Sequence, residues 1–120
     1  MNNLFVWLLV AVCWAGGGEQ QVVGTEEGVA SFYADSLDGN ATASGEKYDK
    51  NALTAAHLKL AFGTRVRVIR KDNGKSVVVV VNDRGPHTEG LLIDLSGAAA
   101  DKLDIKTEGR VEVTLEVLGK

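Results

Sequence analysis

Five consecutive valines, Val77 to Val81, constrain the fold of this chain more than any other feature. They follow a run of alternating basic and apolar residues, Arg65 to Arg70, and a polar segment, 71–75, that centres on Asn73-Gly74. A period of two predicts a strand, and Asn-Gly between two such runs predicts a β-hairpin. Because the valine run contains no polar residue, we expect that strand to be covered on both faces, as in a small closed barrel.

The other periodic segments also read mostly as strands. Val111 to Val117 alternates apolar with polar residues, which predicts a half-exposed strand, and shorter strands are expected at Val29 to Tyr33 and Leu91 to Asp94. Ser96 is a natural N-cap for a short helix that ends near Leu103. The composition of segment 51–60 is compatible with a second short helix.

These elements sum to a mainly β domain of six strands with one or two short helices. Segments 63–68 and 109–113 both begin with glycine and continue as alternating residues, which hints at a two-fold internal repeat. A compact barrel fits this pattern better than a sandwich does.

Length and charge restrict the classes of partner. The 120 residues suit one domain, and 13 Lys and Arg against 16 Asp and Glu give a net charge of −3. This balance gives no electrostatic reason to bind nucleic acid, so we expect a neutral partner and a monomer. With the single cysteine Cys13 and no Cys/His cluster, we expect no disulfide, no metal and no cofactor.

The N-terminus predicts export. Leu4 to Val12 is an unbroken apolar run, too short to span a bilayer, and it matches the core of a secretory signal with cleavage after Ala15. We therefore expect a signal peptide at 1–15, a linker at 16–27 and the folded domain at 28–118. The alternative interpretation of the apolar run is a buried core strand.

Cys13 offers a second interpretation of the same segment. Lipoprotein signals place a lipidated cysteine directly after a short apolar run, although the residue before it is usually small and here is Val12. A secretory signal and a lipoprotein signal both place the mature protein in the periplasm or cell envelope. Lipidation of Cys13 would in addition anchor it to a membrane.

Polar residues of catalytic type cluster in the segments between the expected strands, at 42–49, 54–57, 82–87 and 93–96. Four of them are candidate catalytic residues: Glu46, His57, Asp83 and Asp94. Each also has a structural interpretation: a solvated loop residue for Glu46, a satisfied core histidine for His57, a turn for Asp83 and a helix cap for Asp94.

Together the four supply what cleavage of a glycosidic bond requires, namely a protonated carboxylic acid and polar groups that steady it. We expect them to converge on one surface groove. Asp94 or Asp83 is the expected proton donor, because apolar neighbours disfavour the ionised form of a carboxyl group. Glu46 and His57 are expected to position the acid and the sugar.

At these segments the chain resembles the rare lipoprotein A family of septal lytic transglycosylases. The resemblance covers residues 28–118 in family order. It is carried by Gly28-Val29-Ala30-Ser31-Phe32-Tyr33, Thr42-Ala43-Ser44-Gly45-Glu46-Lys47-Tyr48, Leu53-Thr54-Ala55-Ala56-His57, Phe62-Gly63-Thr64-Arg65-Val66-Arg67-Val68, Asn82-Asp83-Arg84-Gly85-Pro86 and Ile93-Asp94-Leu95-Ser96.

The resemblance implies a double-psi β-barrel and an activity: cleavage of the MurNAc–GlcNAc β-1,4 linkage of peptidoglycan with closure of a 1,6-anhydro ring. It implies a preference for glycan strands stripped of stem peptides, and catalytic roles for Glu46, His57, Asp83 and Asp94. Substrate contacts are expected from residues near these four in the matched segments: Tyr33, Thr42, Tyr48, Asp49, Asn82 and Arg84.

Three features depart from the family pattern. His87 follows Arg-Gly-Pro where an aromatic residue is usual, and Leu91 stands where a basic residue is common. We also expect no SPOR domain after residue 118. An alternative function is a non-catalytic, expansin-like carbohydrate-binding or wall-loosening module, since a fold does not fix an activity. A hydrolase that uses water as acceptor is a third candidate.

Overall fold

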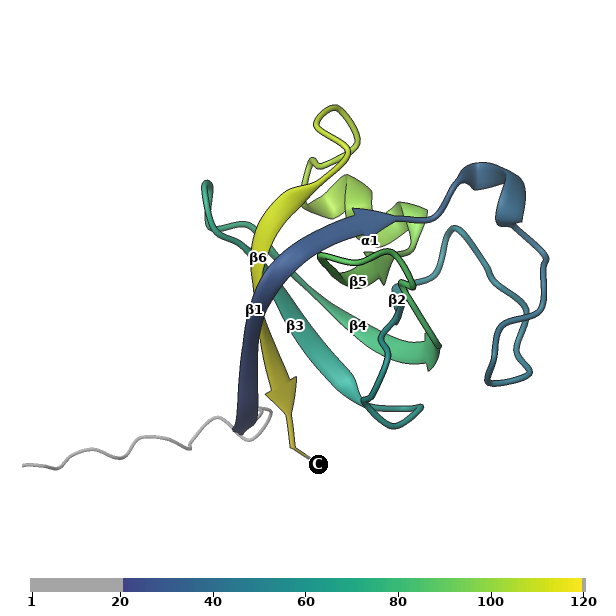
Figure 1. Ribbon diagram of the computed structural model, residues 1–120, viewed down its shortest axis with the longest axis horizontal. Helices are drawn as coiled ribbons and strands as arrows, with labels where there is room; N and C mark the ends of the chain where they lie inside the picture. Colours follow the sequence, from purple (N-terminus) through teal and green to yellow (C-terminus); the bar gives the residue numbers. More distant parts are fainter. Residues whose placement is uncertain (1–20, 120) are drawn as a thin grey trace, which may run out of the picture.

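Six strands close into one barrel in the computed structural model, which describes residues 21–119 (Figure 1). The strands are β1 (Val22–Phe32), β2 (Thr54–Ala56), β3 (Arg65–Arg70), β4 (Ser76–Asp83), β5 (Leu91–Leu95) and β6 (Val111–Leu118). Around the barrel they follow the order β1-β5-β2-β4-β3-β6. The helices in this part of the chain are α1 (Gly97–Lys102) and a 3-10 turn at Asp35–Leu37. The predicted fold class, a mainly β six-stranded barrel, is confirmed.

The predicted hairpin of β3 and β4 is present, with Ile69 opposite Ser76 and Arg65 opposite Val80. Val77, Val79 and Val81 face the core and are buried. The expectation that β4 is covered on both faces is wrong, because Val80, on the outer face, is 37% exposed.

Two similar halves make up the barrel, as the repeat in the sequence suggested. The parallel pairs β1/β5 and β2/β4 correspond to each other, and β3 and β6 lie side by side in antiparallel register. Each of the latter two strands follows a glycine with positive φ, 90° at Gly63 and 84° at Gly109. A residue with a Cβ rarely adopts that conformation, which explains glycine at both positions.

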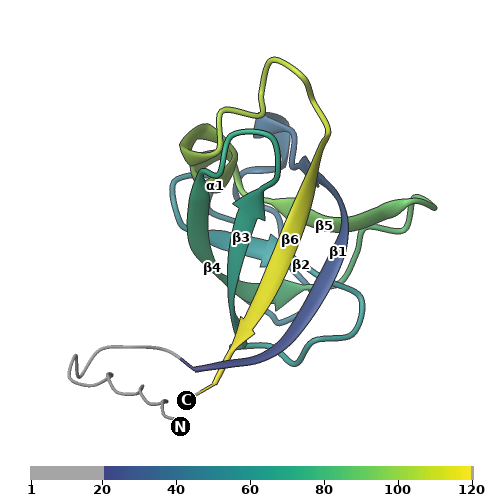
Figure 2. The same cartoon turned by 90° about the vertical axis from the view of Figure 1, so that its left-hand side faces the viewer.

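Strand β1 is longer than predicted and includes residues assigned to the linker. Its first half pairs with β6, Val22 opposite Leu118 and Glu26 opposite Leu115, so the boundary expected at Gly28 falls inside the strand (Figure 2). Most of residues 22–27 are exposed, and their sequence therefore carries no apolar period. Backbone pairing with β6, rather than burial, makes this segment a strand. The expected signal peptide, the start of the linker and Cys13 lie outside the described residues.

Segment 51–60 is not a helix. Residues Thr54–Ala56 form strand β2, inserted between β4 and β5. This tertiary pairing overrides the helical composition. The helix predicted after Ser96 is confirmed: the Ser96 hydroxyl accepts a hydrogen bond from Ala99 N at 3.3 Å and donates one to Ala52 O at 2.6 Å.

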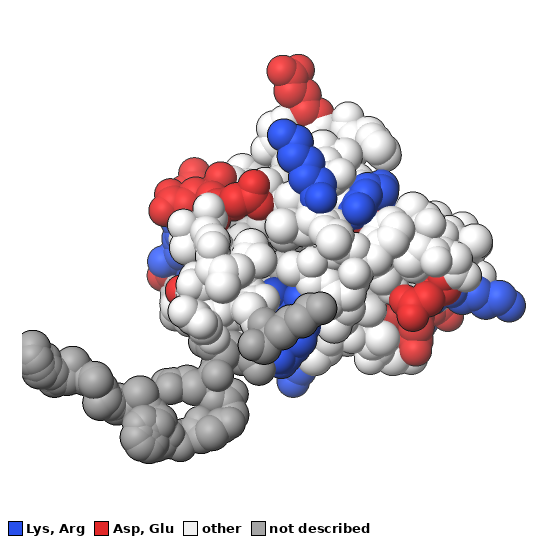
Figure 3. Space-filling view, turned by 90° about the horizontal axis from the view of Figure 1, so that it is seen from below, with Lys and Arg blue, Asp and Glu red and all other residues white. Residues whose placement is uncertain are grey.

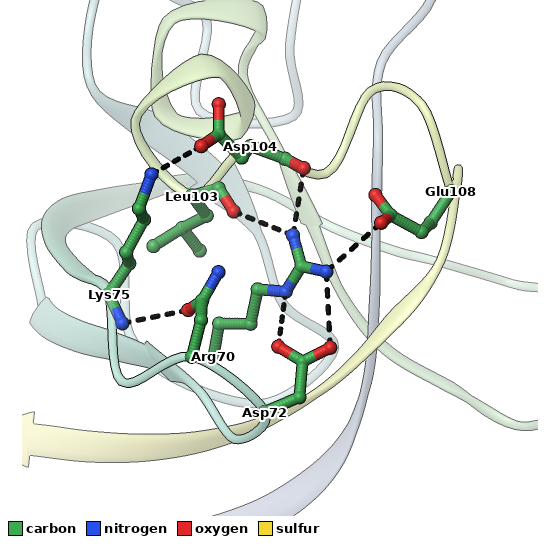
Figure 4. A network of polar contacts seen from close by, with 7 residues as sticks. Arg70, Asp72, Lys75, Leu103, Asp104 and Glu108 are labelled. Carbon is green, nitrogen blue, oxygen red and sulfur yellow. Dashed lines mark hydrogen bonds and ion pairs between the residues drawn. The ribbon is translucent and has the colours of Figure 1, made fainter.

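The core fills the barrel interior, where Ala30, Ala55, Val81, Ile93 and Leu95 are buried together. At the end of the barrel where β3 turns into β4, the buried Arg70 is held by a ring of acceptors (Figure 4). Its guanidinium donates to the carboxylates of Asp72 and Glu108 and to the carbonyls of Leu103 and Asp104. None of the helices between residues 21 and 119 has the length and apolarity needed to cross a membrane.

Candidate active site

The two candidate aspartates flank one residue of the central strand. Ala56 of β2 pairs with Asp83 of β4 on one side and with Asp94 of β5 on the other. Ser31 of β1 pairs with Asp94 and extends the row across a fourth strand. Paired residues of neighbouring strands share a face, so both aspartates lie on one outer face of the barrel. Two strand spacings separate their backbones, roughly 10 Å.

The two carboxylates have different hydrogen-bond partners. Asp83 accepts three bonds, from the Tyr33 hydroxyl, from Ala43 N at 2.8 Å and from Arg84 N at 2.9 Å. Both of its oxygens accept a bond. Asp94 accepts one bond, from the Ser31 hydroxyl, and its other oxygen accepts none from residues 21–119.

Tyr33 is the side chain that donates to Asp83. Burial raises the pKa of its hydroxyl, and the hydrogen bond to Asp83 and the charges of Asp83 and Asp94 raise it further, so the hydroxyl keeps its proton. Its ring stacks on Tyr48 with centroids 4.4 Å apart. Tyr48 itself is 3% exposed and its hydroxyl accepts a bond from Gly97 N. The expectation that Tyr48 contacts substrate is therefore wrong: this side chain supports Tyr33 from within.

The loop 41–47 brings Glu46 to the same place. Asn82, which precedes Asp83, donates its side-chain amide to Glu46 Oε1 at 3.1 Å, and its carbonyl accepts from Ser44 N. The buried Thr42 hydroxyl closes the loop by donating to Glu46 O at 2.7 Å. Glu46 is exposed, whereas Asn82 and Thr42 are mostly enclosed, so these two hold the loop on the end of β4.

The ring of His57 bonds to neither aspartate; its partners among residues 21–119 are Glu26, Lys59 N and Leu60 N. Its ring is 3% exposed, and Nε2 lies 2.8 Å from Glu26 Oε1 on β1. Its backbone still touches the site, because His57 N donates to Asp83 O at 3.1 Å.

Arg84 and Asp49 complete the predicted set. The Arg84 guanidinium donates to the carbonyls of His57 and Leu60 and lies 4.1 Å from the centre of the Phe62 ring, partly exposed beside Asp83. Asp49 is exposed and accepts from Asn51 N at 2.9 Å, which makes it a turn residue at the base of the loop. No contact places Asp49 with the aspartates.

Two residues that contact the predicted ones, Ser31 and Glu26, escaped the sequence analysis. The alternation of the strand could have identified Ser31. It lies between two inward-facing residues, Ala30 and Phe32. Asp94, its partner on β5, lies between Ile93 and Leu95 in the same way. Glu26 gave no such signal, since it lies in the exposed half of β1.

The surface around the barrel carries charges of both signs. In the face drawn in Figure 3, acidic and basic side chains are interspersed over a largely uncharged surface. Such a surface suits a neutral polymer better than a polyanion. Within residues 21–119, no group of three or more His, Cys, Asp or Glu side chains is placed to hold a metal ion.

Comparison with known proteins agrees with this geometry. The family model described as "Lytic transglycolase" matches residues 25–115. Two curated relatives, each 52% identical, are the "Probable endolytic peptidoglycan transglycosylase RlpA" of Nostoc sp. and the "Endolytic peptidoglycan transglycosylase RlpA" of Yersinia pestis. The matches cover 78% and 72% of this chain but only 26% and 24% of those proteins, so this chain spans about a quarter of their length.

The fold has solved counterparts as well. The Streptomyces papain inhibitor superposes with a TM-score of 0.66 at 24% identity, over 84% of this chain and 100% of that one. The apo expansin of Clavibacter michiganensis superposes with a TM-score of 0.64 at 23% identity, over 81% of this chain and 52% of that one. These likenesses establish the fold alone. With the family match over most of its length, the chain belongs to the rare lipoprotein A family of lytic transglycosylases and its described domain is a double-psi β-barrel.

Proposed function

We propose that this domain is an endolytic lytic transglycosylase that cleaves the MurNAc–GlcNAc β-1,4 linkage of peptidoglycan and leaves 1,6-anhydro-MurNAc ends. The observation that supports this most is the pairing of Ala56 with Asp83 and Asp94 on one face of the barrel, in a chain of this family. Tyr33 is bonded to Asp83, and Glu46 is bonded to the neighbouring Asn82. A site of carboxylates and a tyrosine suits proton transfer to a glycosidic oxygen.

Asp94 is the proposed general acid. Only the Ser31 hydroxyl donates to it among the described residues, so its second oxygen can carry the proton and meet the substrate. The protonated carboxyl gives its proton to the glycosidic oxygen, and the bond between that oxygen and C1 of MurNAc breaks. The resulting carboxylate takes the proton from the C6 hydroxyl while O6 bonds to C1, so the acid is restored without water.

Asp83 is the proposed electrostatic partner. Its three donors hold a negative charge in place before the reaction begins, where it stabilises the positive charge that develops on the sugar ring. The roughly 10 Å between the two aspartate backbones leaves room for a sugar. Glu46, held by Asn82 on the solvent side, is placed to bind a sugar hydroxyl.

The substrate and location follow from the same resemblance. We propose that the domain acts as a monomer on glycan strands without stem peptides, and that the chain is exported to the periplasm or cell envelope. Lipidation of Cys13 would then tether it to a membrane.

Digestion in water enriched in oxygen-18 tests the activity. Purified peptidoglycan, with and without prior removal of stem peptides by an amidase, is incubated with the protein and the products are weighed by mass spectrometry. Anhydro ends without the heavy isotope, formed faster on stripped strands, are the expected result. Labelled reducing ends would instead identify a hydrolase, and intact but bound glycan would identify a carbohydrate-binding module.

A further inference from the structure

Glu26 makes a contact that the activity proposed above does not use. Its carboxylate, on a side chain that is 42% exposed, lies 2.8 Å from Nε2 of His57, whose side chain is 4% exposed. Glu26 lies on β1 and His57 directly follows β2, and these two strands are not neighbours in the barrel. The contact therefore bridges the end of the barrel between β1 and the segment that follows β2.

The surroundings of the ring fix its protons. Nδ1 of His57 lies 3.0 Å from Lys59 N and 3.1 Å from Leu60 N, and both backbone amides donate to it. A nitrogen that accepts from N–H groups carries no hydrogen, so the proton sits on Nε2 and is donated to Glu26. Both nitrogens are then occupied within the protein, and the neutral ring has no free lone pair with which to take a proton from a substrate.

The turn that His57 caps holds Arg84. Nη1 of Arg84 donates to His57 O at 3.0 Å and to Leu60 O at 2.8 Å, the first and last residues of the turn. Phe62, just beyond the turn, lies under the guanidinium. The remaining N–H groups of the guanidinium, on Nε and Nη2, donate to no acceptor among residues 21–119. They remain for an oxygen-rich ligand beside Asp83.

We propose that Glu26 and His57 are positioning residues: Glu26 fixes the ring of His57, the ring fixes turn 57–60, and the turn presents Arg84 to oxygen atoms of the bound glycan. This inference rests on the proposed function for its ligand. It assigns His57 no part in proton transfer, and it gives the exposed half of β1 a role in substrate binding.

Kinetics on soluble, peptide-free glycan strands separate positioning from proton transfer. Glu26→Leu and His57→Leu are expected to raise KM roughly tenfold with a smaller change in kcat, because they loosen a binding group. His57→Asn is expected to recover most of the loss, since an Asn side-chain oxygen accepts from the same two amides, as in an Asx turn. Loss of a general acid or base is expected to lower kcat on the order of 10²- to 10⁴-fold. A loss of that size, equal in His57→Asn and His57→Leu, would overturn the proposal.

Glu27 provides the matched control. It is the next residue on β1, faces the other way and pairs with Lys71 at 2.7 Å, so Glu27→Leu removes the same charge without touching His57. We expect its KM to match that of the wild type. The double variant Glu26→Leu, Arg84→Gln is expected to bind no worse than Arg84→Gln alone, since both changes act on one group. If the effects of Glu26→Leu and Arg84→Gln on KM were fully additive in the double variant, Glu26 would not act through Arg84, which would contradict the proposal.

Nitrogen-15 NMR tests the pair even if the protein proves inactive on peptidoglycan. We expect His57 to be the neutral tautomer with hydrogen on Nε2, and the Arg84 side-chain signals to shift in Glu26→Leu but not in Glu27→Leu. Hydrogen on Nδ1 of His57 would overturn the inference. Arg84 side-chain signals at the same positions in Glu26→Leu as in the wild type would also overturn it. Absence of cleavage products with these NMR results intact would count against the proposed activity alone.

Discussion

Tyr33 connects the buried Tyr48 to Asp83 of the candidate site. Its ring rests on Tyr48, its hydroxyl donates to Asp83, and Asp94 is close enough to influence its pKa. Sequence predicted Tyr33 and both aspartates as site residues. It did not predict that Tyr48 is buried while Tyr33 contacts Asp83, because this difference depends on the bond from Gly97 N of α1 to the Tyr48 hydroxyl.

Replacing Tyr33 by phenylalanine is expected to slow turnover about 10- to 100-fold, because a hydrogen bond to a charged group contributes roughly 1.5–3 kcal/mol. The stack on Tyr48 is retained, so the fold should survive. Rates of glycan cleavage check this. The control is Tyr48→Phe, which we expect to lower the melting temperature while costing less activity, and equal rate losses in the two variants would contradict the assignment.

Alkaline stability provides a second test at this scale. The pKa values of Tyr33 and Tyr48 are raised in the folded protein, chiefly by burial, so the native state keeps protons that the unfolded chain loses. The stabilisation is fully present below the unfolded pKa of about 10 and declines as the pH rises above it. Denaturant unfolding between pH 9 and 11 should show this decline, with a shallower slope in Tyr33→Phe. An unchanged slope would contradict the raised pKa of Tyr33.

Among the elements, β1 is the strand whose length could not be predicted from the sequence. The hairpin of β3 and β4, strand β6 and the Ser96 cap were predictable, because their residues carry a period or a capping side chain. The first half of β1 and the short β2 were not, because long-range pairing makes them strands. His57 and Glu26 meet only because of these two pairings, so their contact could not be predicted from the sequence.

Truncation tests the role of β1. A chain beginning at Gln21 is expected to melt cooperatively, whereas one beginning at Gly28 loses the pairing of residues 22–27 with β6 and the Glu26 contact. Hydrogen bonds contribute about 1 kcal/mol each, and 1 kcal/mol shifts the melting temperature of a domain this size by roughly 4–8 °C, so a drop on the order of 10 °C is expected. Equal melting temperatures would show that the outer half of β1 is dispensable.

In the whole molecule, stability and chemistry occupy opposite ends of β4. The Arg70 network lies where the strand begins, and Asn82 and Asp83 lie where it ends (Figures 1 and 4). Arg70 donates through several nitrogens in a planar fork, a geometry that lysine does not reproduce. This separation allows the barrel to be weakened without disturbing the aspartates.

Arg70→Lys and Arg70→Met are therefore expected to lower the melting temperature, Met more than Lys, because the carbonyls of Leu103 and Asp104 lose their donor. At a temperature well below melting, the rate of glycan cleavage should equal that of the wild type. Calorimetry and a rate assay on the same samples check this, and a rate that falls with folding intact would show that the two ends are coupled.

The most direct test of the proposed activity compares the release of 1,6-anhydro ends from stripped glycan strands by the wild type and by Asp94→Asn, with matched melting temperatures. The wild type is expected to form anhydro ends. Asp94→Asn, which keeps the shape but loses the titrating group, is expected to be slower by about 10²- to 10⁴-fold. Near-normal release by Asp94→Asn and by Asp83→Asn, with none by Glu46→Gln, would contradict this account and make Glu46 the acid.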